Sequence, residues 1–416
     1  MRRNPDFLRI FAHDKYQSTM RRIALYLLFI ICTQVRGNDI VPDDSTTWTG
    51  RVQHKLDSLT SLPMFETSQV GLYVRDLTSQ RDIYRLNHRQ RMRPASNQKV
   101  VTAIAALHHL SGSYPIKTQM MMTGEIKDSV LWGDLYVVGG MDPLLAQGDV
   151  LQMAYKLKET GIDSIAGVLR IDLTMKNQDD MGWGWCWDDD MTPLRPLMVD
   201  KHDHFVQEFL DDLQSVGIRG MDIERIMQAP CPADARVIYE VTHTVDQVLP
   251  RMMKKSDNFY AESLFYQLAS LSGKRPAGRK EATGYVDVLI RKVGLKPANY
   301  QIADGSGVSL YNYISPELLV RLLEFAWNDN DMRQSLYPSL PIAGVDGTLE
   351  KRMRKTAAEG NIHAKTGTVD GVSSLSGYAT SPEGHVLVFS IINMGIPRAA
   401  VGRDWQDQVC EVLCKE

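Results

Sequence analysis

Apolar residues recur every three or four positions between Val100 and Leu110, directly after a Pro-Ala-Ser sequence. This spacing places them on one face of a helix, which we expect to begin at Ser96 and to end near Ser111. Ser96 and Lys99 then lie about one turn apart on the same side of the helix. An amine is thereby set beside a hydroxyl at a helix N-terminus, where the local field favours developing negative charge. A capping serine followed by a solvated lysine would give the same pattern.

Alternating apolar and polar residues predict two antiparallel strands before this helix, at 70–77 and 82–87. Further strands are expected at 117–125, 129–138, 167–173, 363–368, 374–380 and 386–393. Helical periodicity indicates helices at 47–62, 150–160, 245–255, 259–271, 281–294, 315–327 and 405–413. The last three strands are joined by short turns, so we expect an antiparallel meander on which the final helix packs. The antiparallel strand pair running into a helix predicts an α+β fold.

Residues 20–37 have the shape of a secretory signal. Two arginines precede an apolar run of ten residues, Ile23–Cys32, and the chain then turns polar. The run is too short to span a bilayer as a mature helix. We therefore expect residues 1–37 to be a leader, cleaved near residues 33–38, and the mature protein to be exported to the periplasm. Translation from Met20 and membrane association through an uncleaved or lipidated N-terminus at Cys32 are open alternatives.

Without this leader the chain has 40 basic and 48 acidic side chains and a net charge of −8. Such a protein has no general attraction to nucleic acid or to anionic lipid. Its 44% hydrophobic and 23% charged residues are typical of a globular protein.

The sequence contains no cysteine and histidine residues with the spacing of a structural zinc site, and we expect neither metal nor cofactor. His202-Asp203-His204 comes nearest to a metal cluster, and we interpret these residues as polar side chains of a loop or of the protein surface. Cys186 and Cys231 can pair in an oxidising compartment, although nothing in the sequence requires it. The tryptophan-rich stretch 181–190 is expected to be a packed aromatic loop rather than a ligand platform.

Three short motifs stand in order along the chain: Ser96-x-x-Lys99, Ser256-Asp257-Asn258 and Lys365-Thr366-Gly367. The first opens a predicted helix, the second lies between two predicted helices and the third lies on a predicted strand. Each motif is common by chance. Their order and their matching contexts together indicate one site for acyl transfer.

Acyl transfer from an amide needs a nucleophile, a proton acceptor, an acid for the leaving amine and donors for the oxyanion. Ser96 is the expected nucleophile, and crowding by cationic and polar groups is expected to lower the pKa of Lys99 enough to accept its proton. Ser256 is expected to relay a proton between the lysines and the leaving nitrogen. Asn258 is expected to hold the substrate's amide side chain or carbonyl and to contact Lys99. Lys365 adds positive charge, which favours a neutral Lys99 and attracts a substrate carboxylate.

The predicted strand after Lys365 supplies the expected substrate-binding residues, Thr366, Gly367 and Thr368. The hydroxyls of Thr366 and Thr368 suit the same substrate carboxylate. The backbone N–H groups of Ser96 and Thr368 are the expected oxyanion hole. The strand also offers an edge to which an extended peptide can add.

The three motifs together resemble the set of active-site serine penicillin-recognising enzymes, both β-lactamases and penicillin-binding proteins. In compact class A β-lactamases the first two motifs lie much closer together, whereas the last two are similarly spaced. The extra block here resembles the penicillin-binding protein 4 family of D-alanyl-D-alanine carboxypeptidases and endopeptidases, peptidase family S13. The resemblance covers residues 50–410, and it is supported by 70–96, 133–143, 255–258, 304–316, 347–349 and 364–368.

This resemblance implies a penicillin-binding/β-lactamase-like transpeptidase fold, with an antiparallel sheet flanked by helices, an all-helical subdomain and an inserted smaller α/β domain. The catalytic domain would occupy 38–115 and 236–416, and the insert 116–235. Family members often carry a larger insert with two nested domains. The stretch 202–245 is too short for that, so we expect an abbreviated insert.

The implied activity is that of a serine-type D-Ala-D-Ala carboxypeptidase acting on peptidoglycan stem peptides through an acyl-enzyme on Ser96, and on D-Ala cross-links as an endopeptidase. β-Lactams are then expected to be covalent inhibitors. One alternative is a serine β-lactamase, which the insert and the lack of a class A-type glutamate loop between Lys99 and Ser256 disfavour. The other is a catalytically silent cell-wall-peptide-binding module, which the three intact motifs disfavour.

Overall fold

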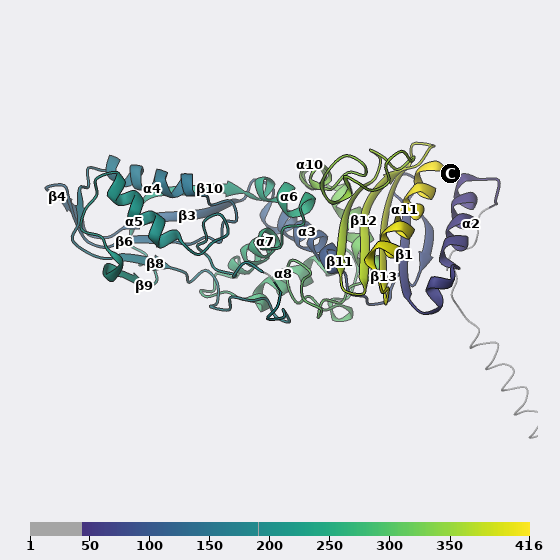
Figure 1. Ribbon diagram of the computed structural model, residues 1–416, viewed down its shortest axis with the longest axis horizontal. Coiled ribbons are helices and arrows are strands. Elements are labelled where there is room, and N and C mark those ends of the chain that lie inside the picture. Colours follow the sequence, from purple (N-terminus) through teal and green to yellow (C-terminus); the bar gives the residue numbers. More distant parts are fainter. Residues whose placement is uncertain (1–43, 190) are drawn as a thin grey trace, which may run out of the picture. The chain divides into compact units, whose positions relative to one another are not determined.

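The computed structural model describes residues 44–189 and 191–416, so the expected leader lies outside the described residues. Within them, one five-stranded sheet has the order β11-β12-β13-β1-β2, with every neighbouring pair antiparallel. The predicted N-terminal hairpin and C-terminal meander are confirmed, and the pairing of β1 with β13 joins them (Figure 1). The strands are β1 (Gln69–Asp76), β2 (Arg81–Leu86), β11 (His363–Val369), β12 (Val372–Thr380) and β13 (Val386–Met394).

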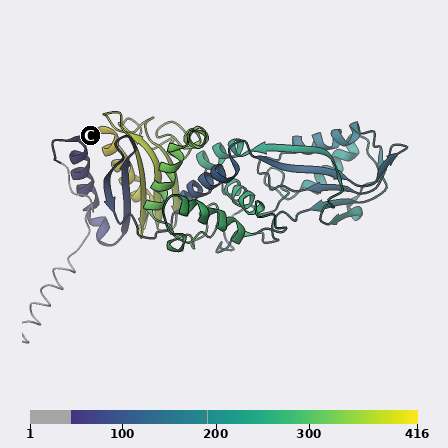
Figure 2. The same cartoon turned by 180° about the vertical axis from the view of Figure 1, so that it is seen from behind.

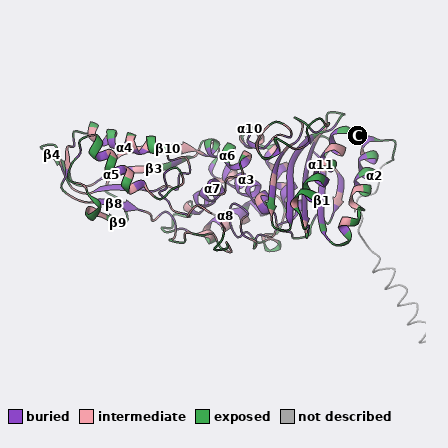
Figure 3. Ribbon diagram, in the orientation of Figure 1, coloured by how far each residue is buried: buried purple, intermediate pink, exposed green. Residues whose placement is uncertain are grey.

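Successive side chains of a strand point to opposite faces of a sheet. Neighbouring residues of β1 therefore pack against different helices on the two faces of this sheet. On one face, Leu72 shares a hydrophobic cluster with residues of α2 (Trp48–Thr60) and α11 (Ala399–Lys415). Figure 1 shows α11 lying across this face. On the other face, Tyr73 belongs to a cluster with α9 (Pro316–Asn328), which contacts β1 and β13. Figure 2 gives the view from that side, and Figure 3 shows the strands buried between the layers.

The second hydrophobic cluster continues into a group of helices that contains the first two motifs. The helix α3 contacts α6, α7, α8, α9 and α10, so its apolar residues, including Val100 and Leu110, are buried on all sides. The helix α9 begins where it was expected, because the Ser315 hydroxyl caps it by accepting a hydrogen bond from the Leu318 N–H at 3.2 Å. The helices are α3 (Gln98–Leu110), α6 (Val245–Lys254), α7 (Asn258–Ser270), α8 (Arg279–Lys292) and α10 (Asn330–Ser339).

A second five-stranded sheet has the order β10-β3-β6-β8-β9. Its pairs β10–β3 and β3–β6 are antiparallel, whereas β6–β8 and β8–β9 are parallel. The helices α4 (Gln147–Glu159) and α5 (Phe205–Ser215) share a hydrophobic cluster with it. β10 lies beyond the expected boundary at residue 235. The strands are β3 (Pro115–Met122), β6 (Leu135–Val138), β8 (Leu169–Asp172), β9 (Ile226–Gln228) and β10 (Arg236–Thr244).

The strands predicted at 117–125 and 129–138 were wrong in their extents. The chain leaves the second sheet after Met122 and forms a separate three-stranded sheet of β4 (Glu125–Lys127), β5 (Val130–Trp132) and β7 (Ser164–Ile165). Gly124 has a φ of +73°, a conformation that favours glycine. A Cβ on Gly133 would lie 2.0 Å from the Thr123 carbonyl oxygen. The two glycines therefore allow the backbone segments around Gly124 and Gly133 to approach closely, at positions where unbroken strands were expected.

The elements α5, α10, β9 and β10 were not predicted. In α5, Phe205, Phe209 and Leu213 are buried at helical spacing, so the signal was present in the sequence. The strand β10 is mostly half-exposed and carries a weak alternation. Within residues 44–189 and 191–416, no helix has both the length and the apolar character needed to cross a membrane.

Candidate active site

Ser96 lies in a tight turn that leads into α3 rather than in the α-helix itself. The turn is a 3-10 helix, Ala95–Asn97, and the α-helix begins at Gln98. Ala95 has a φ of +49°, which is uncommon for a residue with a side chain. A Cβ on Gly307 would lie 1.9 Å from the Ala95 carbonyl oxygen, so only glycine fits there. The Ser96 turn is thus held in an unusual conformation by a closely packed neighbouring loop.

Lys99 is fully buried, and its Nζ has three hydrogen-bond partners from three parts of the chain. It lies 3.0 Å from Ser96 Oγ, 2.6 Å from Asn258 Oδ1 and 2.7 Å from the Ser306 carbonyl oxygen. Three acceptors match the three donors of an ammonium group. The first two motifs of the sequence therefore meet at this amine.

The pKa of Lys99 is lowered to about 8. Burial is the largest cause, because it penalises the charged form of the amine. The carboxylates of Asp304, Glu262 and Asp257 oppose it by stabilising the ammonium. The expected lowering is present, but its main cause is burial rather than crowding by cations.

The Lys365 amine lies beside the remaining serine of the motifs. Its Nζ donates to Ser256 Oγ and to the Thr366 carbonyl oxygen, both at 2.8 Å. Lys365 is fully buried, and burial followed by the nearby Lys99 holds its pKa well below the usual value. The two lysines are closed off, whereas both hydroxyls and Asn258 are partly exposed. The two hydroxyls and Asn258 are therefore the parts of this cluster that a ligand can reach first.

The strand β11 carries Lys365, Thr366, Gly367 and Thr368, and it forms one end of the five-stranded sheet. It packs against the Ser96 turn so closely that a Cβ on Gly367 would lie 2.8 Å from the Pro94 carbonyl oxygen. Thr366 Oγ1 donates to Thr348 Oγ1 at 2.7 Å, and Thr368 is exposed.

Asn97 fixes the Ser96 turn to this strand. Its Nδ2 donates to the Lys365 carbonyl oxygen at 3.1 Å and to Ser374 Oγ at 2.7 Å. Both bonds are buried. Nothing in the sequence distinguished Asn97 from the variable positions of the first motif.

The loop 304–307 presents the Ser306 carbonyl to Lys99, and two acidic side chains shape it. Glu262, buried in α7, accepts hydrogen bonds from the backbone N–H groups of Gly305 at 3.0 Å and Ser306 at 2.8 Å. Burial and the neighbouring Asp304 raise the pKa of Glu262 to about 8. Asp304 accepts from Gly307 N at 2.8 Å. A glutamate among the buried positions of α7 was the signal that could have identified Glu262.

The tryptophan-rich stretch lies beside this loop. Trp185 Nε1 donates to Asp304 Oδ2 at 2.9 Å, and the Trp183 and Tyr311 rings are 5.1 Å apart. Met191 Sδ accepts from Asn258 Nδ2 at 3.4 Å. Trp187 is 92% exposed. The expected packed loop therefore describes Trp185 but not Trp187.

Other residues considered in the sequence take no part in this cluster. Cys186 and Cys231 are free in the structure. The rings of His202 and His204 stack 5.6 Å apart, and His204 Nε2 lies 3.0 Å from Glu208 Oε1. Among the described residues, no group of three or more His, Cys, Asp or Glu side chains could hold a metal ion.

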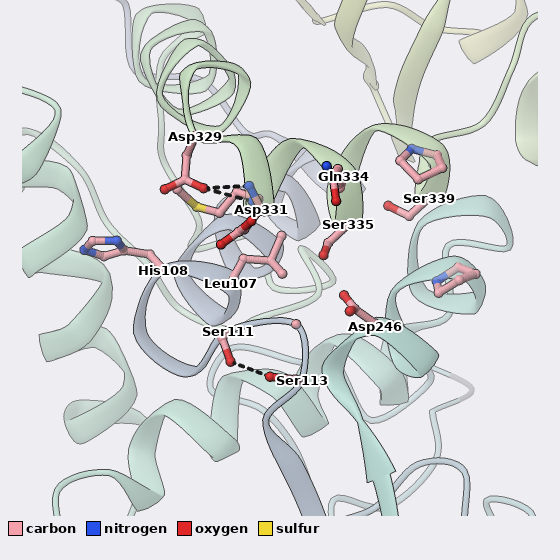
Figure 4. Close-up of a pocket in the computed structure, with 14 residues that line it drawn as sticks. Leu107, His108, Ser111, Ser113, Asp246, Asp329, Asp331, Gln334, Ser335 and Ser339 are labelled. Carbon is pink, nitrogen blue, oxygen red and sulfur yellow. Dashed lines mark hydrogen bonds between the residues drawn. The ribbon is translucent and has the colours of Figure 1, made fainter.

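A separate pocket of about 690 Å³ opens beside the end of α3 (Figure 4). Its lining includes His108, Asp246, Asp329 and Asp331 and none of the predicted site residues. Asp329 is engaged as the N-cap of α10, where it accepts from the Asp331 N–H at 3.1 Å. We assign no function to this pocket.

Comparisons with a family profile and with individual proteins both match D-alanyl-D-alanine carboxypeptidases. The sequence profile of the D-Ala-D-Ala carboxypeptidase 3 (S13) family matches residues 52–206 and 197–415. D-alanyl-D-alanine carboxypeptidase DacB of Haemophilus influenzae is 26% identical over 407 residues, which cover 78% of this chain and 85% of that protein.

Two solved structures of penicillin binding protein 4 (dacB) from Haemophilus influenzae are similar to this structure. The first has a TM-score of 0.77 at 25% identity and covers 86% of this chain and 97% of that chain. The second, a complex with a β-lactam, has a TM-score of 0.71 at 25% identity and covers 86% and 98%. The fold expected from the sequence is confirmed.

Proposed function

The chain belongs to the D-Ala-D-Ala carboxypeptidase 3 (S13) family, and we propose that it hydrolyses the terminal D-Ala-D-Ala bond of peptidoglycan stem peptides through an acyl-enzyme on Ser96. It is a serine-type D-Ala-D-Ala carboxypeptidase. The observation that carries the proposal is the 3.0 Å contact between Ser96 Oγ and the buried amine of Lys99. A hydroxyl becomes a strong nucleophile when an adjacent group takes its proton. With its pKa lowered to about 8, Lys99 is suited to that task near neutral pH.

In the proposed first step, Ser96 Oγ attacks the carbonyl carbon of the penultimate D-Ala while its proton passes to Lys99 Nζ. The carbonyl oxygen becomes an oxyanion, for which the backbone N–H groups of Ser96 and Thr368 are the proposed donors. The hydrogen bonds from Lys99 to Asn258 and Ser306 hold the amine beside the hydroxyl.

The leaving amine of the terminal D-Ala needs a proton before the tetrahedral intermediate collapses. Ser256 Oγ is the proposed donor, because Lys365 Nζ is hydrogen-bonded to it at 2.8 Å and can restore its proton. The C–N bond then breaks, the terminal D-Ala leaves as a free amino acid and the acyl group stays on Ser96. Lys365 and the hydroxyls of Thr366 and Thr368 are proposed to bind the terminal carboxylate.

Water completes the proposed cycle by attacking the carbonyl carbon of the Ser96 ester, while its proton passes through Ser256 to Lys365. The ester C–O bond then breaks, Lys99 returns its proton to Ser96 Oγ, and the shortened peptide is released. A β-lactam presents its strained amide to the same nucleophile. Because its ring opens without losing a fragment, the acyl group stays over the site and shields the ester. We therefore propose that β-lactams acylate Ser96 and that the adduct is long-lived.

The proposal is tested with the protein lacking residues 1–37, using fluorescent penicillin and a pentapeptide that ends in D-Ala-D-Ala. We expect stable labelling and release of D-Ala by the wild type, and neither by Ser96→Ala. Rapid turnover of penicillin without D-Ala release would instead identify a β-lactamase. No labelling and no D-Ala release by a folded wild type would leave a wall-peptide-binding module.

We also propose endopeptidase activity on D-Ala cross-links. β11 forms the end of its sheet, and the outer edge of such a strand can pair with an extended peptide. A cross-linked stem peptide differs from the pentapeptide in having a second stem as its leaving group. Incubation with a purified cross-linked muropeptide dimer is expected to yield monomers, and an unchanged dimer together with D-Ala release from the pentapeptide would restrict the enzyme to carboxypeptidase activity.

Export to the periplasm remains a proposal that rests on residues 20–37. Sequencing the N-terminus of the mature protein tests it. A start between residues 33 and 39 is expected, whereas a mature protein that retains residues 20–32 would contradict cleavage.

A further inference from the structure

The middle residue of the second motif makes a contact that the proposed chemistry does not use. Asp257 lies between Ser256 and Asn258, and its side chain is only 9% exposed. Lys201 Nζ donates to Asp257 Oδ2 at 3.0 Å, and Arg251 Nε donates to the same oxygen at 3.1 Å. Arg251 comes from the adjacent helix α6. Lys201 comes from the inserted segment, 56 positions away in the sequence.

The turn that carries the motif needs fixing, because its backbone is strained. Ser256 has a φ of +59°, which is unfavourable for a residue with a side chain. Asp257 is the N-cap residue of α7 but makes no capping hydrogen bond with its side chain. Its carboxylate is directed to the two cations instead. The three consecutive residues of the motif are therefore held by Lys365, by the Lys201–Arg251 pair and by Lys99, respectively.

The turn that carries Lys201, residues 199–202, is held in a defined conformation by hydrogen bonds. Val199 and His202 exchange two backbone hydrogen bonds, at 2.9 and 2.8 Å, around a two-residue turn. Both turn residues have positive φ, +48° for Asp200 and +67° for Lys201, where glycine or asparagine is usual. Asp200 anchors the turn, since its backbone N–H donates to the Leu145 carbonyl oxygen at 2.9 Å and its carboxylate accepts from the Gln147 N–H at 3.2 Å.

We propose that Lys201 is a positioning residue that acts through Asp257 to fix the turn between α6 and α7. The inference rests on the proposed acyl-transfer function. The Lys201–Asp257 contact would keep Ser256 and Asn258 at hydrogen-bonding distance from Lys365 and Lys99, respectively. It assigns the inserted segment a direct part in assembling the active site. Displacing reacting groups by a fraction of a contact distance is enough to slow a reaction strongly.

The charge of Lys201 gives the proposal a second readout. Lys99 is faced by the carboxylates of Asp304, Glu262 and Asp257 and by the amine of Lys365. Lys201 and Arg251 partly neutralise Asp257. Without Lys201, the less compensated carboxylate stabilises the Lys99 ammonium more, so the pKa of Lys99 rises and the acid limb of the rate profile moves to higher pH.

The test compares Lys201→Met, which removes the charge, with Lys201→Arg, which keeps it. The control is Lys158→Met, because the Lys158 side chain is about as exposed as that of Lys201, 36% against 32%, and also forms an ion pair, with Asp163. Lys158 lies on α4, in the helix layer of the second sheet. D-Ala release from a pentapeptide and acylation by fluorescent penicillin are measured from pH 6 to 9, with the melting temperature of each variant. We expect Lys201→Met to lower kcat by between about ten- and a hundredfold with KM little changed.

The same variant should shift the acid limb to higher pH, Lys201→Arg should recover most of kcat, and Lys158→Met should match the wild type. Wild-type kcat and an unshifted profile in Lys201→Met would overturn the positioning role and leave the proposed function intact. A folded wild type that neither releases D-Ala nor binds penicillin would overturn both. If Lys201→Met fails to fold, Lys201→Gln takes its place, with the same outcomes.

Discussion

At the scale of single residues, the main feature of the candidate site is that both of its lysines, Lys99 and Lys365, are fully buried. An ammonium group is costly to remove from water, so it is retained in a core only with partners or with a lowered pKa. Lys99 has both, with three acceptors within 3.0 Å and a pKa of about 8. Lys365 has acceptors from Ser256 and its own strand. The motif spacing identified both lysines, but only the packing shows that burial sets their pKa.

The pH dependence of acylation follows from this burial. In the proposed mechanism the reactive form of Lys99 is the neutral amine, and its fraction falls about tenfold for each pH unit below the pKa. The second-order rate constant for labelling by fluorescent penicillin should therefore rise between pH 6 and about 8 and then level off. Stopped-flow labelling across that range measures it. A rate that stays constant over the same range would show that Lys99 is not the proton acceptor.

Replacing Lys99 by arginine separates its charge from its basicity. A guanidinium keeps the positive charge but does not give up its proton in this pH range. Lys99→Arg should lower the acylation rate by about a hundredfold or more, the usual contribution of a general base. Labelling is measured at pH 8, and circular dichroism checks the fold. Near-wild-type labelling by a folded Lys99→Arg protein would contradict the assignment.

At the scale of elements, the site depends on loops and turns that are packed against one another at van der Waals contact. The helix α3 and the strand β11 were predicted from periodicity, and both are present. The loop 304–307 was visible only as a turn-rich sequence. The Ser306 carbonyl of this loop accepts from Lys99, and the Ser306 N–H is held by Glu262. Glu262 lies 44 positions earlier in the chain, so the sequence does not indicate its contact with the loop. Local patterns predict elements, whereas such contacts arise from the tertiary packing.

The close approach at Gly307 predicts a large difference between two glycine substitutions. In Gly307→Ala the Cβ would lie 1.9 Å from the Ala95 carbonyl oxygen, at a φ of +87°. The free energy of unfolding should fall by about 1–3 kcal/mol or more. Acylation of Ser96 should slow, because the added Cβ displaces the turn Ala95–Asn97. Denaturant unfolding and penicillin labelling measure the two effects.

Gly284 is the matched control, because it lies within α8 and a Cβ there meets nothing within 4 Å. Gly284→Ala should raise the free energy of unfolding by about 0.5–1 kcal/mol through helix propensity, with labelling unchanged. Equal effects of the two substitutions would rule out steric control of the Ser96 turn by Gly307.

At the scale of the whole molecule, the described chain brings three distant motifs into one site. The α+β class, the first hairpin and the C-terminal meander were predictable because hydrophobic periodicity is a local property. The second sheet was predicted only in part, since β9 and β10 are short or half-exposed and pair with strands far away in the sequence. The contact between Lys201 and Asp257 could not be predicted either, because a lysine in a polar loop looks like ordinary surface charge.

The central claim is that Ser96 forms the acyl-enzyme, and peptide mapping by mass spectrometry tests it most directly. The protein is incubated with penicillin, quenched in acid and digested. We predict one penicilloyl adduct per chain, located on the peptide that contains Ser96 and absent from Ser96→Ala. An adduct on Ser256 instead, or one that persists at full yield in folded Ser96→Ala, would contradict the account.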